Sequence, residues 1–381
     1  MRKLKIGYDA KRSFHNFRGL GNYSRTLISS IARYYPQHHY YLYTTPYIET
    51  GVTSWHQGHQ NIHLVKPKGM ATLFPNLWRS RYVTNNILND KLDIYHGLSH
   101  ELPANIKKTG AKAIVTIHDL IFMRYPQFFP WLDRQVYKHK FTTSCRQADL
   151  IIAISEQTKT DLTNMLAIPA EKITVVNQGV NPIFFKEKDS LFNQRLSKQL
   201  KLPPSYLLSV GTIEERKNTK QIVRALKKLQ HTIDHHLVLV GKGKQYKQEV
   251  LSLAQELGIV DRVLVLSNIN DDQLKSIYEQ ADVFIFPSLF EGWGLPIVES
   301  LLAKTPVITS CGSCFMESGG NHSLYINPQD EVELSQAIIR VLKDKELQQT
   351  MIHKGYQHAQ QFTHQKVTDN LMQAYKQVVA E

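Results

Sequence analysis

The residues best suited to chemistry lie in the segment 286–299, which reads FPSLFEGWGLPIVE. An apolar run with β character leads into a proline and two glycines, Gly292 and Gly294, after which apolar residues recur with helical spacing. This order predicts a strand, a tight turn and a helix. Glycine allows a ligand to approach the backbone closely, and the free N–H groups at the start of a helix suit a phosphate.

Two carboxylates flank this expected anion site. Glu291 precedes the turn, and Glu299 is expected in the first helical turn. A phosphate alone would disfavour both, whereas the hydroxyls of a sugar beside a phosphate would give each carboxylate a donor. The alternative is an ordinary strand–helix junction with an acidic first turn.

A second candidate is the segment 211–218, which reads GTIEERKN and follows an apolar run. Arg216 and Lys217 are adjacent cations near Gly211, and such a pair could neutralise a diphosphate leaving group. An Arg-Lys pair on a loop is usually solvated, so its significance depends on its nearness to the first candidate.

A third candidate is the segment 19–24, GLGNYS, which follows an expected polar loop over 9–18. It resembles the dinucleotide fingerprint, but Ser24 replaces the third glycine and the loop before it is long, so a dehydrogenase is disfavoured. We expect Gly19 and Gly21 to form a glycine-rich loop whose amides face a ligand across a cleft.

The elements that must position these residues alternate between strands and helices, which predicts doubly wound parallel sheets. The length of 381 residues indicates two domains. We expect a Rossmann-like N-terminal domain over 1–182, a charged linker over 183–202, a Rossmann-like C-terminal domain over 203–362, and a helix over 363–381 that packs across the domain boundary.

Composition narrows the class of protein. No apolar run reaches about 18 residues and the N-terminus reads as a first strand, so we expect a cytoplasmic protein without a signal peptide or a membrane span. Three cysteines cannot form a disulfide framework. Cys311 and Cys314 have the spacing of a zinc half-site or a dithiol, but without a second pair we interpret them as structural thiols.

The net charge of +13 lies almost entirely in the first half of the chain. Residues 1–185 contain 23 Lys and Arg against 11 Asp and Glu, and residues 186–381 contain 23 against 22. The basic half therefore indicates an anionic partner, such as a phospholipid headgroup, a diphosphate-linked acceptor or nucleic acid. The alternative is that the charge serves only solubility.

An ordered set of motifs resembles the family-4 (group 1) retaining glycosyltransferases, which have the GT-B fold. The matching segments run almost from end to end: 19–24, 116–120 (TIHDL), 153–156 (AISE), 175–181 (VVNQGVN), 211–218, 240–243 (VGKG), 286–299 and 306–310 (PVITS). The resemblance implies two Rossmann-like domains that face each other across a cleft.

The resemblance also implies roles for individual residues. Glu299 would hold the ribose hydroxyls and Glu291 the hydroxyls of the donor sugar, and His118 would lie near the transferred sugar. The diphosphate would be held by backbone and cationic groups of the second domain and approached by glycines of the first: Gly211, Arg216, Lys217, Gly292, Trp293, Gly294 and Leu295, with Gly19 and Gly21.

Three positions depart from the family pattern. Thr212 stands where many relatives have an arginine, so Arg216 is expected to replace that cation. Glu317 matches the family although the proline before it is missing, and Lys304 replaces a frequent glycine. No Asp-X-Asp motif occurs, which fits phosphate binding without a metal.

The sequence therefore predicts a metal-independent, retaining hexosyltransferase. It would move a sugar (mannose, glucose, galactose or an N-acetylhexosamine) from a nucleoside diphosphate to a glycan or lipid-linked glycan in cell-surface polysaccharide or lipopolysaccharide synthesis. No cofactor and no nucleic-acid partner are expected, and the basic domain would contact the inner face of the membrane peripherally. The alternatives are a sugar-nucleotide epimerase or hydrolase on the same fold, and a non-enzymatic protein that binds anionic polymers or membranes.

Overall fold

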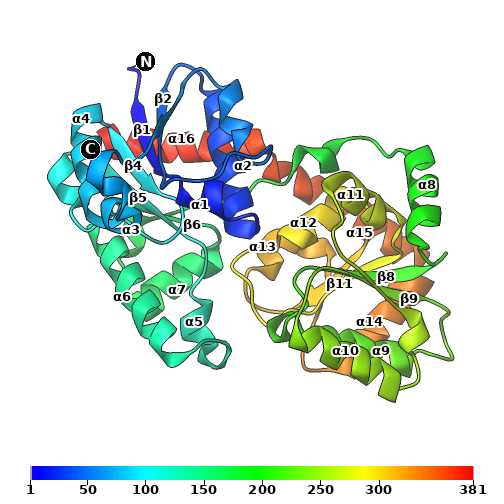
Figure 1. Cartoon of the computed structure of the whole chain (residues 1–381). Coiled ribbons are helices and arrows are strands. Elements are labelled where there is room, and N and C mark those ends of the chain that lie inside the picture. Colours follow the sequence, from blue (N-terminus) through cyan, green and yellow to red (C-terminus); the bar gives the residue numbers. More distant parts are fainter. Residues whose placement is uncertain (1, 381) are drawn as a thin grey trace. The chain divides into compact units, whose positions relative to one another are not determined.

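The apolar runs form two parallel sheets, each in its own part of the chain (Figure 1). The computed structural model describes residues 2–380. The chain divides into a first unit, which extends to Gly179 and includes the segment from His364 onward, and a second unit, Val180–Thr363. In the part of the chain that the structure describes, no helix is both long and apolar enough to span a membrane.

The sheet of the first unit has seven strands in the order β3-β2-β1-β4-β5-β6-β7, all parallel. The inner strand β1 is buried along most of its length, and Ile6 lies between Tyr40 and Ile94. Burial on both faces explains why these strands read as nearly continuous apolar runs. The strands are β1 Lys5–Asp9, β2 His39–Tyr43, β3 Ile62–Val65, β4 Ile94–Gly97, β5 Lys112–Ile117, β6 Leu150–Ala153 and β7 Ile173–Val175.

Helices connect these strands, and the last helix of the chain joins them. They are α1 Lys11–His15, α2 Gly19–Tyr34, α3 Pro75–Leu77, α4 Val83–Asp90, α5 Ile121–Arg124, α6 Trp131–Gln147, α7 Glu156–Leu166 and α16 His364–Ala380. Helix α16, red in Figure 1, packs beside α2. Its apolar side, which includes Leu371, Met372 and Tyr375, is part of the core of the first unit.

The sheet of the second unit has six parallel strands in the order β10-β9-β8-β11-β12-β13. In Figure 1, α9, α10 and α14 lie on one side of this sheet and α11 and α12 on the other. The strands are β8 Tyr206–Val210, β9 His236–Val240, β10 Val263–Leu266, β11 Val283–Phe286, β12 Val307–Ser310 and β13 Leu324–Ile326. The helices are α8 Ser190–Leu200, α9 Thr219–Lys228, α10 Gln245–Glu256, α11 Asp271–Gln280, α12 Leu295–Leu302, α13 Phe315–Gly319, α14 Glu331–Lys343 and α15 Lys345–Ala359.

The segment expected to be a charged linker, 183–202, is instead part of the second unit. It contains α8, whose first turn is capped by the side chain of Asp189. From α8, Asn193 donates a hydrogen bond to the carboxylate of Glu279 over 3.0 Å, and Ser197 donates to Gln280 over 2.6 Å. The charged side chains therefore cover the outer face of a packed helix.

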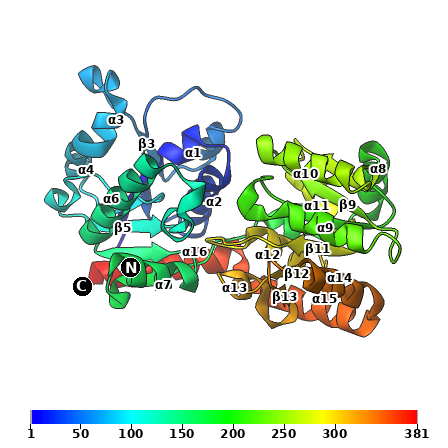
Figure 2. The same cartoon turned by 90° about the horizontal axis from the view of Figure 1, so that it is seen from below.

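In each sheet, the strand order reverses direction at one point. In the first unit this point lies between β1 and β4, and in the second between β8 and β11. From there the connecting segments run to opposite faces, so a crevice opens at the carboxyl ends of the two strands, where open α/β sheets bind ligands. Figure 2 shows both sheets from below.

Candidate active site

The two cations of the second unit lie at its reversal point, in the connection after β8. Gly211 follows the strand with a φ of +141°, a conformation that favours glycine. A short 3₁₀ helix, Glu215–Lys217, contains both cations, and Asn218 ends it in the left-handed conformation. The positive φ values at Gly211 and Asn218 allow the chain to turn within this short connection and return to helix α9.

Arg216 and Lys217 converge on one carboxylate. Arg216 Nη1 lies 2.7 Å and Lys217 Nζ 2.6 Å from the same oxygen, Oε1 of Glu291. Arg216 also forms an ion pair of 2.7 Å with Glu214. Burial acts to raise the pKa of Glu291, but Lys217 and Arg216 outweigh it and hold the pKa below its ordinary value. Arg216, Lys217 and Glu291 therefore form a charged triad.

Hydrogen bonds join the two connections that supply this triad. The backbone N–H of Leu289 donates to the carbonyl of Arg216 over 2.9 Å. The Arg216 guanidinium donates to the carbonyl of Phe290 over 2.6 Å, and the Asn218 amide donates to the carbonyl of Pro287 over 3.2 Å. The segments after β8 and β11 are therefore held together, as the strand order requires.

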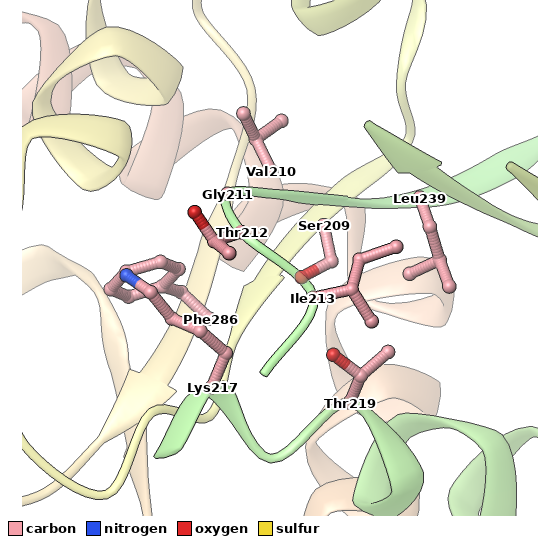
Figure 3. Close-up of a pocket in the computed structure, with 9 residues that line it drawn as sticks. All are labelled: Ser209, Val210, Gly211, Thr212, Ile213, Lys217, Thr219, Leu239 and Phe286. Atoms are coloured by element: carbon pink, nitrogen blue, oxygen red, sulfur yellow. The ribbon is translucent and has the colours of Figure 1, made fainter. Parts of the chain in front are cut away.

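A small pocket opens beside the triad (Figure 3). The side chain of Lys217 lies against the ring of Phe286, with Nζ 4.7 Å from the ring centroid. The lining combines backbone of the Gly211 turn with hydroxyl and apolar side chains: Ser209, Val210, Gly211, Thr212, Ile213, Lys217, Thr219, Leu239 and Phe286. Thr212, which departs from the family pattern, thus lines this pocket.

The glycine turn leads into helix α12 as expected. Gly294 is its N-cap and Leu295 its first residue, while Gly292 and Trp293 lie in the connection before it. Trp293 is buried, and its ring packs edge-on against Phe362 at 5.2 Å between centroids. The ring of Trp293 therefore packs within the second unit.

Glu299 is the fifth residue of α12, so it lies in the second turn and not in the first as predicted. The Tyr278 hydroxyl donates to its carboxylate over 3.1 Å. Burial raises the pKa of Glu299 to about 8, although the bond from Tyr278 acts to lower it. The unliganded side chain is therefore mostly protonated at pH 7.

Ser313 and Cys314 contact the backbone of Glu291, which the sequence did not indicate. The Ser313 hydroxyl donates to the Glu291 carbonyl over 2.9 Å, and the Cys314 thiol donates to the same oxygen over 3.3 Å. Cys314 is buried and Cys311 exposed, and neither forms a disulfide. The segment 311–314 helps to hold the triad in place, and no local pattern could have shown which residue it contacts.

In the first unit, His118 directly follows β5, next to the reversal point. It is 4% exposed. Its Nε2 lies 2.9 Å from the carbonyl of Leu98, which can only accept, so Nε2 carries the proton. Nδ1 then accepts from the Gln178 amide over 3.2 Å. Both ring nitrogens therefore have a partner, and the tautomer is determined by the backbone.

The environment of His118 keeps it neutral. Burial lowers its pKa to about 4, and Arg12 acts in the same direction. Tyr23 packs edge-on against the ring at 4.7 Å, and His100 lies 5.1 Å away. His100 has a φ of +69°, which is uncommon for a residue other than glycine.

The expected glycine-rich loop over 19–24 is instead the start of helix α2. Gly19 is its first residue, and the preceding segment contains a short helix, α1, where a polar loop was expected. A Cβ on Gly21 would lie 1.6 Å from the carbonyl oxygen of Asn16, so only glycine fits there. The first turn of α2 contains no acidic residue, and Arg12 is exposed nearby in sequence. The N-terminus of α2 remains compatible with an anion.

A buried chain of polar groups leads from the C-terminal helix toward His118. The Tyr375 hydroxyl lies 3.3 Å from that of Tyr8 and 2.6 Å from Nδ1 of His96. Nε2 of His96 lies 2.8 Å from the Thr116 hydroxyl, which is 3.5 Å from the hydroxyl of Tyr23. Burial lowers the pKa of His96 to about 3. Tyr23 in turn contacts His118, so α16 supports this site indirectly.

Among residues 2–380, no group of three or more His, Cys, Asp or Glu side chains could hold a metal ion.

Family models match both halves of the chain. The model described as Glycosyltransferase Family 4 matches residues 17–183, and the model described as Glycosyl transferases group 1 matches residues 192–358.

Among the similar proteins, O-antigen chain mannosyltransferase B of Escherichia coli is 27% identical over 287 residues, which are 74% of each chain. O-antigen chain mannosyltransferase RfbU of Salmonella typhimurium is 26% identical over 224 residues, 59% of each chain.

Solved structures resemble the whole chain. A glycosyltransferase from Rickettsia africae superposes with a TM-score of 0.78 at 17% identity, covering 100% of this chain and 99% of that one. HepE of Anabaena, crystallised with UDP and glucose, gives 0.77 at 17% identity, covering 98% and 100%. At these identities the likeness shows the fold. The two family models together account for most of the sequence, and the chain belongs to the group 1, or family 4, glycosyltransferases with the GT-B fold.

Proposed function

We propose that this glycosyltransferase moves a hexose from a nucleoside diphosphate to a hydroxyl of a glycan or lipid-linked glycan, with retention of anomeric configuration, in the synthesis of a cell-surface polysaccharide. The observation that carries the proposal is the triad at the reversal point of the second sheet, where Arg216 and Lys217 meet Glu291 near the start of α12. Mannose is the first donor sugar to test, because O-antigen mannosyltransferases are among the similar proteins.

The second unit supplies the donor-binding groups in this proposal. The diphosphate lies between the two cations and the backbone amides at Gly294 and Leu295, where two attractive features coincide. The ribose hydroxyls donate to Glu299, whose place on α12 is one turn beyond that start. The Oε2 atom of Glu291 accepts from the donor sugar, while Oε1 holds the cations.

Negative charge builds up on the leaving diphosphate during the reaction. As the bond between the anomeric carbon and the phosphate oxygen breaks, negative charge develops on that oxygen. Arg216 and Lys217 are held in place before the substrate arrives, so their stabilisation of this charge requires little rearrangement. We propose that these cations make a metal unnecessary.

The first unit takes the acceptor in this proposal, and His118 acts there as a neutral hydrogen-bonding group. Its low pKa means that it adds no charge at pH 7. Gln178, which donates to Nδ1, holds the ring in one orientation. Gly19 and Gly21 lie at the start of α2, whose amides suit a phosphate of the donor or of the acceptor.

We infer further that the first unit contacts anionic membranes peripherally, at the inner face of the cell membrane, where a lipid-linked acceptor would lie. The segments 1–179 and 364–381 contain 25 Lys and Arg against 13 Asp and Glu, so the excess of positive charge stays in this unit. Anionic headgroups attract such a surface.

Thermal unfolding with a panel of nucleotide sugars tests the donor assignment, because a ligand that binds the folded state raises the unfolding temperature. We expect GDP-mannose or a UDP-hexose to stabilise the protein, and product analysis with a glycan acceptor to show transfer. Rapid, stoichiometric conversion of the donor without an acceptor would instead indicate an epimerase or a hydrolase.

A further inference from the structure

Four large apolar side chains in the first unit are turned to solvent within eight consecutive residues. Met70 is 84% exposed, Leu73 73%, Phe74 64% and Leu77 43%. Met70 lies in a 3₁₀ turn, Gly69–Thr72, and Leu77 in helix α3. Leu73 and Phe74 form the link between these two elements, and the backbone leaves helical geometry at Phe74. Exposed apolar groups this close together usually mark an interaction surface.

The chain directly after α3 is anchored to the rest of the first unit. Trp78, which follows α3, is buried and donates from its indole to Asn86 over 3.1 Å. Arg79 forms ion pairs with Asp9 and Glu101. The four apolar side chains are therefore presented on a fixed support.

Positive charge surrounds the apolar side chains. Residues 50–89 contain four Lys and Arg and not one Asp or Glu. Arg79 is occupied by its two carboxylates, but Lys68 and Arg81 are exposed. Lys11 adds a cation, since its Nζ donates to Asn76 of α3 over 3.0 Å. A partner for this surface must therefore be apolar at its centre and anionic at its rim.

We propose that the segment 66–82 docks on an anionic phospholipid bilayer. Met70, Leu73, Phe74 and Leu77 would enter the boundary between headgroups and acyl chains, and Lys68, Arg81 and Lys11 would contact phosphates. Protein–protein interfaces tend to exclude lysine, whereas amphipathic membrane surfaces are rich in it, so the composition favours lipid over a protein partner. This inference rests on the proposed function, because docking would bring the acceptor-binding unit to a lipid-linked acceptor.

Co-sedimentation of the full chain with vesicles tests the surface. The vesicles would contain phosphatidylcholine alone or with about one third phosphatidylglycerol, at low and high salt. We expect binding to the anionic vesicles that weakens with salt. The variant Leu73→Glu/Phe74→Glu should raise the lipid concentration for half binding at least tenfold. The control Leu191→Glu/Val332→Glu changes the charge equally at exposed apolar positions of the second unit and should bind as the unmodified chain does.

Three results would overturn the inference. The first is equal vesicle binding by Leu73→Glu/Phe74→Glu and Leu191→Glu/Val332→Glu, and the second is no binding of the unmodified chain to anionic vesicles. The third is equal binding of the unmodified chain to vesicles with and without phosphatidylglycerol. Stabilisation by nucleotide and transfer to a water-soluble acceptor are measured on the same preparations. If both persist in Leu73→Glu/Phe74→Glu while vesicle binding is lost, the docking surface and the catalytic function are separate. If the unmodified chain binds vesicles but no nucleotide, the proposed function fails and the docking surface stands.

Discussion

The reversal points of the two sheets contain different chemistry on the same architecture. In the second unit, Arg216, Lys217 and Glu291 form a charged triad. In the first unit, His118 and His96 are buried and neutral, and each is hydrogen-bonded at both ring nitrogens. A leaving diphosphate requires charge that is already in place, whereas orientation of an acceptor requires a rigid group that brings no charge. Under the proposed function, we therefore expect the second unit to stabilise charge and the first unit to orient the acceptor.

The largest effect is expected from removal of both cations. Arg216→Ala/Lys217→Ala should lower turnover by about 10²–10³-fold, because the charge on the leaving group loses its stabilisation. It also leaves the buried Glu291 unpaired, at a cost of about 3–5 kcal/mol in the free energy of unfolding. Steady-state kinetics and denaturant unfolding measure the two effects.

The matched control for that variant is Lys220→Ala, which removes a cation three residues further on, where Lys220 pairs with Glu249 at the surface. Its turnover should be unchanged. If the double variant turns over as fast as this control, the triad has no part in the reaction.

A smaller effect, about 10²-fold or less in turnover, is expected for His118→Ala, because the acceptor loses a group that orients it while charge stabilisation remains.

The pH dependence of the free energy of unfolding also tests the state of His118. The pKa of His118 in the folded chain is about 4, below its ordinary value, so the unfolded chain binds more protons between those values and stability falls as the pH drops from about 6.5 to 4.

Urea unfolding between pH 4 and 7 measures this loss, which should be smaller in His118→Ala than in the unmodified chain. His235→Ala in the second unit serves as a control. An activity step near pH 6.5 that His118→Ala abolishes would show that His118 is charged in the working enzyme, and would contradict the comparison.

Glu299→Gln should weaken nucleotide binding by about 10–100-fold, since the ribose hydroxyls lose a charged acceptor.

The protonation of Glu299 gives a second prediction. Because the pKa of Glu299 is raised to about 8, the folded chain holds its proton between pH 4.5 and 8, and stability falls as the pH rises through that range. Ribose hydroxyls that donate to Glu299 favour its ionised carboxylate, so nucleotide binding at pH 7 should release a proton.

Calorimetry in buffers of different ionisation enthalpy measures that proton. We expect release by the unmodified chain at pH 7 and none by Glu299→Gln. Proton uptake, or equal release by both proteins, would remove Glu299 from the nucleotide site.

The smallest effect is expected for Tyr375→Phe, which removes the hydroxyl that contacts His96. Stability should fall by about 1–3 kcal/mol, because a buried ring nitrogen loses its partner. Turnover should fall only a few-fold, since His118 keeps its own two hydrogen bonds. The control is Tyr35→Phe, which removes a hydroxyl that follows α2 and donates to Asp369 of α16 over 2.8 Å. A loss as large as that of His118→Ala would show that the buried chain does more than support the site.

Much of the fold could be predicted because the strands are buried on both faces. Apolar runs at 206–210 and 283–286 coincide with β8 and β11, most of whose residues are buried. Helix α8 was not assigned because it lies in a segment rich in polar and charged residues, and its contacts with α11 make it part of the second unit. Gly19 and Gly21 read as a loop because glycine is a poor helix former, yet close packing against Asn16 places Gly21 in α2.

The sequence named residues for the candidate site but did not show how they contact one another. Arg216, Lys217 and Glu291 were expected to have separate ligand partners, and the structure pairs them with one another. Cys314 contacts Glu291 through its thiol, which no spacing reveals. The contact of His96 with Tyr375 joins residues 279 positions apart. Such long-range contacts depend on strand order, which local patterns do not determine.

The most direct test compares how strongly a nucleoside, its monophosphate and its diphosphate raise the unfolding temperature of the unmodified chain and of Arg216→Ala/Lys217→Ala. Guanosine and uridine series would both be used. We predict that in the unmodified chain the diphosphate stabilises most, that the double variant loses this advantage, and that the effect of the nucleoside is the same in both proteins. An advantage of the diphosphate that persists in the double variant would contradict the assignment of Arg216 and Lys217 to the leaving group.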